Sequence, residues 1–186
     1  MVRTLLFMGD EIIPDDKNWT WVLEKPCDDC GFRASEFDVL KTGKALRDLA
    51  SRWEIVLQQS GATVRPKPNV WSPTEYGCHV RDVFRKFDER LQLMIEELDP
   101  RFENWDQDKT AIEDDYEHQN PSVVSAELKD SAQLLARRFD AVRSDQWSRR
   151  GFRSDGSAFT VASIAQYLMH DPIHHLWDVG SEVPRY

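Results

Sequence analysis

An apolar stripe constrains this sequence more than any other feature, because its members are three or four residues apart and only an α-helix gathers that spacing on one side. The stripe comprises Tyr76, Val80, Val83, Phe87, Leu91, Met94 and Leu98. In front of it, Ser72, Pro73 and Glu75 occupy the cap, the first and the third positions of a helix N-terminus. The sequence therefore predicts a long helix that begins after Ser72 and ends at Asp99-Pro100.

Three further segments have the same periodicity and predict helices over residues 35–60, 121–142 and 160–177. Ser35, Asn120 and Thr160 are the expected caps, and Pro121 follows its cap directly. Four amphipathic helices of this length indicate an all-α four-helix bundle over residues 35–186. Residues 1–34 show no sustained helical period, so we expect an irregular N-terminal arm in which the segment TWVLE (20–24) forms a short strand.

The charge and the cysteine content restrict the partners and the compartment. The formal net charge is −9, and nucleic-acid affinity rests on an excess of Lys and Arg, so we expect no nucleic-acid partner. No stretch approaches the roughly 20 apolar residues of a membrane span, and the first residues lack the features of a signal peptide. Three cysteines, an odd number, suit a reducing cytoplasm, which is the location that we expect.

Three histidines are candidate metal ligands. His170 and His174 are four residues apart, so their rings project from one side of a helix and could bind one divalent ion. The intervening residues Asp-Pro-Ile lack the glutamate of a zinc protease, which argues against a peptidase. His79 lies one turn into the second predicted helix, and a three-nitrogen site would leave one coordination position open, as in catalytic centres. The alternative is that these histidines are core residues hydrogen-bonded to backbone carbonyls.

Two motifs carry a resemblance to a known family. They are W-S-x-x-E-x-x-x-H at residues 71–79 and H-x-x-x-H-H-L-W at residues 170–177. In helix order and spacing the chain resembles the DinB-like superfamily, including the branch related to mycothiol-dependent maleylpyruvate isomerases and to bacillithiol and mycothiol S-transferases. The resemblance implies a bundle of up-down-down-up topology that is often a homodimer. It also implies a divalent ion, zinc first and nickel or another metal next, held by His79, His170 and His174.

Two residues complicate that ligand set. Pro172 lies between the paired histidines, and its kink could either spoil their geometry or start a fresh turn that directs His174. His175 continues the apolar face of the last helix better than His174 does, and it forms its own i, i+4 pair with Asp171. We keep His174 as the predicted ligand and His175 as an outer-sphere or substitute ligand. Asp171 and Glu75 are candidates to orient an imidazole through its second nitrogen.

The pair Cys27 and Cys30 has the C-x-x-C spacing and admits three interpretations. The two thiols could be free, they could form a redox pair, or they could be half of a second zinc site completed by other ligands or by a second subunit. The neighbouring Asp28 and Asp29 disfavour thiolate and so argue against a fast nucleophile.

The connections between the helices supply further candidates. The connection 101–119 is long for a bundle, and loops of that length often line a binding site. Its candidates for a wall of the site are Asn104, Trp105 and Asp106. A basic patch for an anionic substrate could come from Arg149, Arg150 and Arg153 near the start of the last helix.

The predicted function is that of a metal-binding protein, and the favoured interpretation is an enzyme in which the metal activates a nucleophile. The family resemblance implies that a small thiol such as mycothiol is transferred to a small electrophile, with hydrolysis or isomerisation as neighbouring reactions. The alternative is a non-enzymatic, stress-associated bundle that binds a metal or a ligand. If the histidines are all structural, a plain helical interaction module remains.

Overall fold

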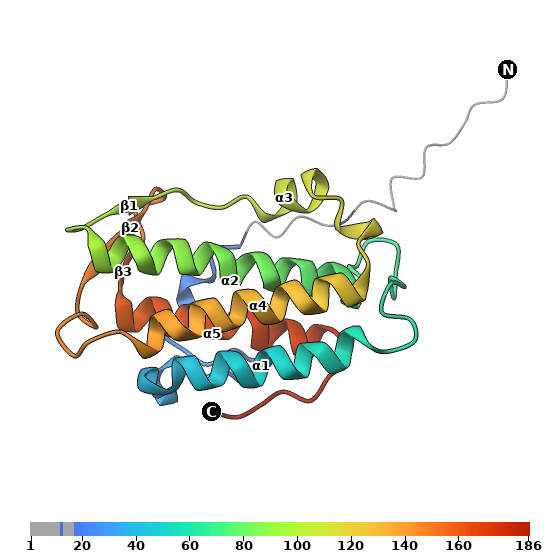
Figure 1. Ribbon diagram of the computed structural model, residues 1–186, viewed down its shortest axis with the longest axis horizontal. Coiled ribbons are helices and arrows are strands. Elements are labelled where there is room, and N and C mark those ends of the chain that lie inside the picture. The colour runs from blue at the N-terminus through green and yellow to red at the C-terminus, as the bar shows by residue number, and fades with distance from the viewer. Residues whose placement is uncertain (1–11, 13–16) are drawn as a thin grey trace, which may run out of the picture.

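The computed structural model describes residue 12 and residues 17–186, so the first part of the predicted arm, residues 1–11 and 13–16, lies outside the described residues. Figure 1 shows that the first and last long helices run one way and the two between them run the other way. This is the predicted up-down-down-up order. The four helices are α1 (Thr42–Leu57), α2 (Pro73–Glu96), α4 (Pro121–Asp140) and α5 (Val161–Asp178).

The helix N-termini form where the sequence predicts them for three of the four long helices. At α2, the Ser72 hydroxyl accepts a hydrogen bond from the Glu75 amide at 3.3 Å, and the Glu75 carboxylate accepts one from the Ser72 amide at 2.8 Å. At α5, Thr160 and Ser163 make the same reciprocal pair. Asn120 caps α4 by accepting from the amide of Ser122. These caps satisfy amides that have no partner inside the helix.

The predicted start of the first helix at Ser35 is wrong. Two short 3-10 helices, η2 (Ala34–Glu36) and η3 (Val39–Lys41), precede α1, which begins at Thr42. The reason is local, because the Asp38 side chain accepts from the Leu40 amide at 3.1 Å and so caps η3. The strand expected in the arm is likewise the 3-10 helix η1 (Trp19–Leu23), which Asn18 caps.

A small sheet joins the two long connections at one end of the bundle. Strand β2 (Arg150–Arg153) pairs in parallel with β1 (Arg101–Phe102) and antiparallel with β3 (Ala158–Thr160). The connection from β1 to α4 also contains α3 (Gln107–Glu113) and η4 (Tyr116–His118), and Figure 1 shows it running back along α2. Strands this short have too few residues for a period-2 pattern, so they could not be predicted from the sequence.

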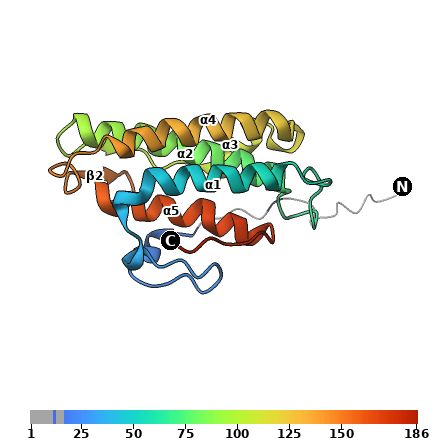
Figure 2. The same ribbon diagram turned by 60° about the horizontal axis from the view of Figure 1, so that its bottom comes forward.

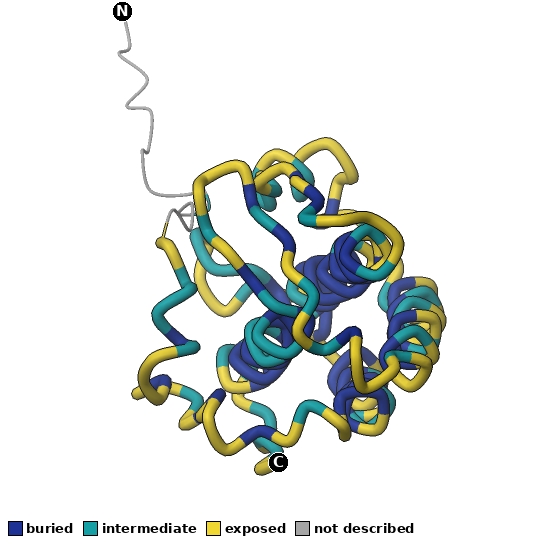
Figure 3. The backbone as a smooth tube through the Cα atoms, turned by 90° about the vertical axis from the view of Figure 1, so that its left-hand side faces the viewer, coloured by how far each residue is buried: buried dark blue, intermediate teal, exposed yellow. Residues whose placement is uncertain are grey.

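The core lies between the four long helices, with α4 packed along both α1 and α2. Figure 3 shows the buried positions on the inner sides of these helices. The arm is part of the packed body, since η1 and η2 contact α5 and the side chains of Val22, Cys27 and Phe32 are buried. Figure 2 shows the arm beside α5, on the side away from α4. None of the helices in the described part of the chain has the length and apolar content of a membrane span.

Candidate metal centre and its pocket

The C-terminal half of α5 presents two overlapping pairs of candidate ligands. His170 and His174 form one i, i+4 pair, and Asp171 and His175 form the other, one residue further on. Successive residues of an α-helix point about 100° apart, so the two pairs face different surroundings. The helix continues through Pro172, whose carbonyl accepts a hydrogen bond from the buried Trp53 indole at 3.3 Å. Both pairs therefore keep helical spacing.

The second pair meets His79 of α2. We call His79, Asp171 and His175 the pocket cluster, because their donor atoms all lie within 4.8 Å of one another. The His79 Nε2 atom is 3.4 Å from the Asp171 carboxylate, and the His175 Nε2 atom is 3.8 Å from the same group. Two imidazole nitrogens thus face one carboxylate, which is a donor set that divalent transition metals accept.

Neighbouring side chains fix the two imidazoles. The Nδ1 atom of His175 is 2.7 Å from a carboxylate oxygen of Asp178, one turn further along α5. The Trp105 ring stacks on the His79 ring, with centroids 5.4 Å apart and planes within 5° of parallel. A carboxylate on the far nitrogen of a metal-ligating histidine is the usual arrangement, since it sets the tautomer and the ring orientation.

The polar atoms of the pocket cluster are suited to a cation. Burial would raise the pKa of the Asp171 carboxyl, but the charges of His79 and His175 outweigh it and lower the pKa to about 2. The Oδ1 atom of Asp171 is buried and has no hydrogen-bond partner among the described residues, and the same holds for Nδ1 of His79. An anionic oxygen in this position needs a positively charged partner, so the residues present fit a divalent ion.

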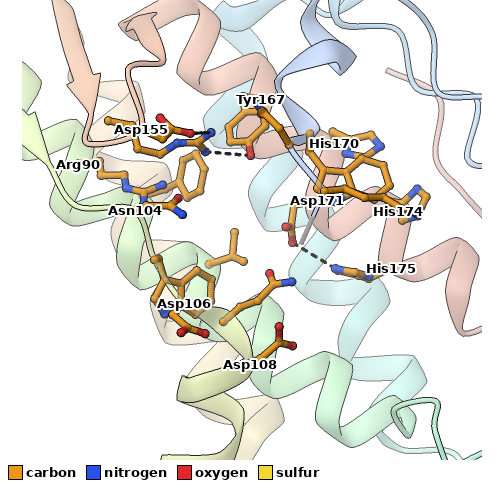
Figure 4. A pocket seen from close by; sticks show the side chains of 18 residues that line it. Arg90, Asn104, Asp106, Asp108, Asp155, Tyr167, His170, Asp171, His174 and His175 are labelled. Atoms are coloured by element: carbon orange, nitrogen blue, oxygen red, sulfur yellow. Dashed lines mark hydrogen bonds and ion pairs between the residues drawn. The ribbon is translucent and has the colours of Figure 1, made fainter. Parts of the chain in front are cut away.

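A pocket of about 420 Å³ opens onto this cluster. Figure 4 shows Asp171 and His175 on one side of it and the guanidinium-bearing Arg90 on another. The wall includes Trp19 of the arm as well as Asn104, Trp105 and Asp106 of the connection after β1. The site is therefore concave and mostly preformed, as sites for small molecules usually are.

Two arginines give the far side of the pocket a positive charge. Arg90 is only 7% exposed and lies over the rings of Phe87 and Phe102, at 5.2 and 5.1 Å. Its guanidinium donates a hydrogen bond to the backbone carbonyl of Glu103 at 3.1 Å, and no carboxylate pairs with it in the part of the chain that the structure describes. Burial and the nearby charge of Arg153 lower the pKa of Arg90 to about 10. This guanidinium stays charged at neutral pH and can accept an anionic ligand.

Arg153 reinforces that charge from the sheet. It forms an ion pair with Asp155 at 2.7 Å and donates to the Tyr167 hydroxyl at 3.3 Å. Its Nε atom is buried without a hydrogen-bond partner among residue 12 and residues 17–186. A ligand oxygen could satisfy that nitrogen, so the two arginines together form the anion-binding side of the pocket.

The first pair of α5 meets the arm. We call Cys27, Cys30, His170 and His174 the arm cluster, and their donor atoms also lie within 4.8 Å of one another. The structure thus divides the predicted ligand set, with His79 in the pocket cluster and His170 and His174 in the arm cluster. His170 and His174 also border the pocket. The substitute candidates His175 and Asp171 are the residues that join His79.

The other sequence candidates have separate positions. Glu75 belongs to neither cluster, because its carboxylate accepts from Arg65 at 3.1 Å and from the Ser72 amide. Asn104, Trp105 and Asp106 line the pocket, and Asp106 also caps α3. Of the three arginines suggested as a basic patch, Arg153 lines this pocket, whereas Arg149 and Arg150 line a different one near the end of α2.

Sequence reasoning missed Arg90 and Tyr167. The signal for Arg90 was available, since a charged residue lies next to Leu91 and three positions after Phe87 in the stripe of α2. A charged side chain at the edge of a buried face needs a partner or a function. Tyr167 lies on α5 one turn before the arm and pocket clusters, and its pKa is raised by burial.

Comparisons with known proteins agree with this architecture. Residues 42–179 match the sequence model of the DinB superfamily. No curated protein sequence matches the chain. One similar solved structure is YfiT from Bacillus subtilis, described as a probable metal-dependent hydrolase with an unusual four-helix bundle topology. The TM-score is 0.68 and the sequence identity is 15%, over 92% of this chain and 95% of that one. The mycothiol-dependent maleylpyruvate isomerase is similar with a TM-score of 0.60 and 12% identity, over 81% of this chain and 66% of that one.

Proposed function

Since the chain belongs to the DinB superfamily, we propose that it is a metal-dependent enzyme whose divalent ion is held by the pocket cluster of His79, Asp171 and His175. The single observation that carries the proposal is the half-buried Asp171 carboxylate, whose buried Oδ1 atom faces two imidazoles at the edge of a pocket of about 420 Å³. Three protein ligands leave a coordination position open, as in catalytic rather than structural sites.

The donor set narrows the choice of metal. Two histidines and one carboxylate suit zinc first, and nickel or iron(II) are alternatives that the same atoms accept. When bound, such an ion lowers the pKa of a coordinated water or thiol and polarises a carbonyl group. The Asp178 carboxylate holds the His175 ring in place through Nδ1, and the stacked Trp105 ring does the same for His79.

The pocket walls indicate the class of substrate. Arg90 lies across the pocket from Asp171 and His175 (Figure 4), and Arg153 also lines the pocket. The two guanidinium groups would bind an acidic group, such as a carboxylate. The overall charge of −9 repels anions on average, so the two guanidinium groups supply the local attraction that such a substrate needs. Trp19 and Trp105 line the pocket with flat apolar surfaces that would exclude water from the reacting group.

The reaction that we infer is the transfer of a small thiol, of the mycothiol type, to an electrophile that carries the acidic group. The thiol releases its proton to solvent, its sulfur forms a bond to the electrophilic carbon, and the leaving group departs with the former bonding pair. Hydrolysis would use the same site with water in place of the thiol. Support for the thiol comes from the similar fold of an isomerase that is itself described as mycothiol-dependent.

One experiment separates these reactions from simple binding. Protein loaded with zinc, nickel or iron(II) is incubated with electrophiles that carry a carboxylate, with and without mycothiol, and with the methyl esters of the same electrophiles. We expect thiol consumption that needs the metal and the carboxylate. Turnover without thiol would make the protein a hydrolase instead.

The controls keep the result interpretable. Asp171→Ala should abolish turnover, whereas Arg150→Gln, which alters an exposed arginine paired with Asp99 outside the pocket, should leave it unchanged. No turnover with any metal, thiol or electrophile, from protein that does bind the metal, would overturn the enzyme proposal. It would leave the non-enzymatic metal-binding bundle as the function.

A further inference from the structure

The arm cluster has a geometry that the pocket does not use. Cys27 and Cys30 come from the arm, and His170 and His174 come from α5, about 140 residues later. The Sγ atom of Cys27 and the Nδ1 atom of His174 are 3.5 Å apart. Two ligands of a tetrahedral zinc ion, with Zn–S of about 2.3 Å and Zn–N of about 2.0 Å, would be about 3.5 Å apart.

The backbone around the cysteines forms a tight turn that places both thiols on one side. The Gly31 amide donates to the Cys27 carbonyl at 2.9 Å, and the Cys27 amide donates to the Phe32 carbonyl at 2.9 Å. Gly31 has a φ of +75°, which favours glycine, and a Cβ there would meet no atom within 4 Å. Glycine is therefore selected by the conformation of the turn and not by lack of space.

One donor atom of the cluster is unsatisfied. His170 is 4% exposed, and its Nε2 atom has no hydrogen-bond partner in the described residues. A buried imidazole nitrogen without a hydrogen-bond partner is free to bind a metal ion.

Aromatic rings surround the histidines of this centre. The Trp19 ring lies 5.2 Å from the His170 ring and 5.1 Å from the His174 ring, and the Phe32 ring is 6.0 Å from His170. Cys27 is buried and Cys30 is half-buried. Four protein donors in an apolar shell are typical of a closed structural zinc site, whereas catalytic sites keep one position open.

We propose that the arm cluster binds a structural zinc ion through the two thiolates of Cys27 and Cys30 and the imidazoles of His170 and His174. Binding releases one proton from each thiol, and no redox change occurs. The ion fastens the arm to α5 at the helical turn that also carries Asp171 and His175. It thereby holds Trp19 against the pocket. This zinc site does not depend on the proposed enzymatic function, since its four donors differ from those of the pocket cluster.

The test uses the full chain, purified with a reducing agent and loaded with either zinc or cobalt(II). The proposal predicts a thiolate-to-cobalt charge-transfer absorption in the unmodified protein, which requires no variant to fold. It also predicts that Cys27→Ser with Cys30→Ser lowers the zinc content by one ion per chain and removes that absorption. The matched control is Cys78→Ser, because Cys78 is buried on α2 away from the cluster and its replacement should change neither value.

The outcomes also separate this proposal from the pocket metal. Replacement of His79 and Asp171 by Ala should remove the pocket ion and leave the thiolate absorption intact, even if the pocket never catalyses a reaction. Cobalt-loaded protein without a thiolate absorption would overturn the proposal. So would a double cysteine variant that retains as much zinc as Cys78→Ser, or a Cys27–Cys30 disulfide that survives the reducing agent.

Discussion

The arm cluster and the pocket cluster are built from the same two turns of α5, yet they differ in almost every property. The arm cluster has four donors in an aromatic shell, whereas the pocket cluster has three donors beside a pocket of about 420 Å³. The difference arises from a shift of one residue, since His170 and His174 are each followed directly by a member of the other pair. Rotation of about 100° per residue is enough to direct one pair to the arm and the next to the pocket. A single helix can thus supply both a closed and an open metal site.

Asp178 is the residue that connects the two clusters. Its carboxylate is 2.7 Å from Nδ1 of His175 in the pocket cluster and 3.9 Å from Nε2 of His174 in the arm cluster. The shorter contact is a hydrogen bond and the longer one is a loose ion pair at most. The comparison therefore predicts that changes in one cluster affect the other only weakly, and four experiments test this.

The largest expected effect concerns the docking of the arm. If zinc is present at about 1,000 times its Kd, it stabilises the docked arm by about 4 kcal/mol. Amide hydrogens of residues 19–34 should then exchange about 1,000-fold faster in the Cys27→Ser, Cys30→Ser variant. Those of α2 and α4 should keep their protection. Hydrogen exchange followed by mass spectrometry measures the exchange rates of the arm and of the two helices. If the protection of the arm does not change, the cluster does not hold the arm against α5.

The next effect concerns the pocket metal. Asp171→Ala should weaken metal binding in the pocket by more than about 100-fold. Replacing a residue that only hydrogen-bonds to a metal ligand already lowers metal affinity by about 10- to 100-fold, and Asp171 is a proposed ligand itself. The readout is metal per chain after dialysis, together with the Kd from competition with a chelator. Asp106→Asn is the matched control, since Asp106 also lines the pocket and Asn keeps the cap of α3. Equal losses in the two variants would contradict the assignment.

Asp178→Asn should affect the two clusters unequally. The substitution removes the negative charge that lies beside Nδ1 of His175. Metal binding in the pocket should therefore weaken by about 10- to 100-fold, while the arm cluster keeps its zinc. Titration of the cobalt-loaded protein with a chelator resolves the two sites by their spectra. If both sites weaken by the same factor, the clusters act as one unit and the contrast between them fails.

The smallest expected effect is on substrate binding. Arg90→Gln should raise KM for an acidic substrate by about 10-fold with little change in kcat, since a hydrogen bond to a charged group contributes about 1.5 kcal/mol or more. The metal content of both clusters should stay the same. Steady-state kinetics with the acid and its methyl ester check this, and an equal KM change for both compounds would assign Arg90 a structural role.

The helices could be predicted from the sequence because their signals are local. Ser72, Asn120 and Thr160 each cap the helix that the sequence assigned to them, and the bundle and its superfamily are confirmed by the fold and the family match. The start of α1 could not be found in this way. Asp38 competes with Ser35 as a capping residue, and the arm that packs on this segment is set by tertiary contacts.

The division of the histidines was harder to predict for a different reason. Helical spacing tells which side chains share a face, but it does not tell which neighbouring segment that face meets. By helical angle His175 continues the inner face of the last helix, whereas the resemblance to the DinB-like superfamily favours His174 as the ligand. The position of Cys27 and Cys30 against α5 depends on an irregular arm without periodicity, so the zinc interpretation of the C-x-x-C pair remained one of three.

Tryptophans lie beside both clusters, with an optical consequence. Trp105 stacks on His79 of the pocket cluster, and Trp19 lies against both histidines of the arm cluster. A paramagnetic ion such as nickel or cobalt in either place would quench the emission of the adjacent indole. Replacing Trp19 by Phe should then remove part of the quenching caused by an ion in the arm cluster, and replacing Trp105 by Phe should remove part of that caused by an ion in the pocket cluster.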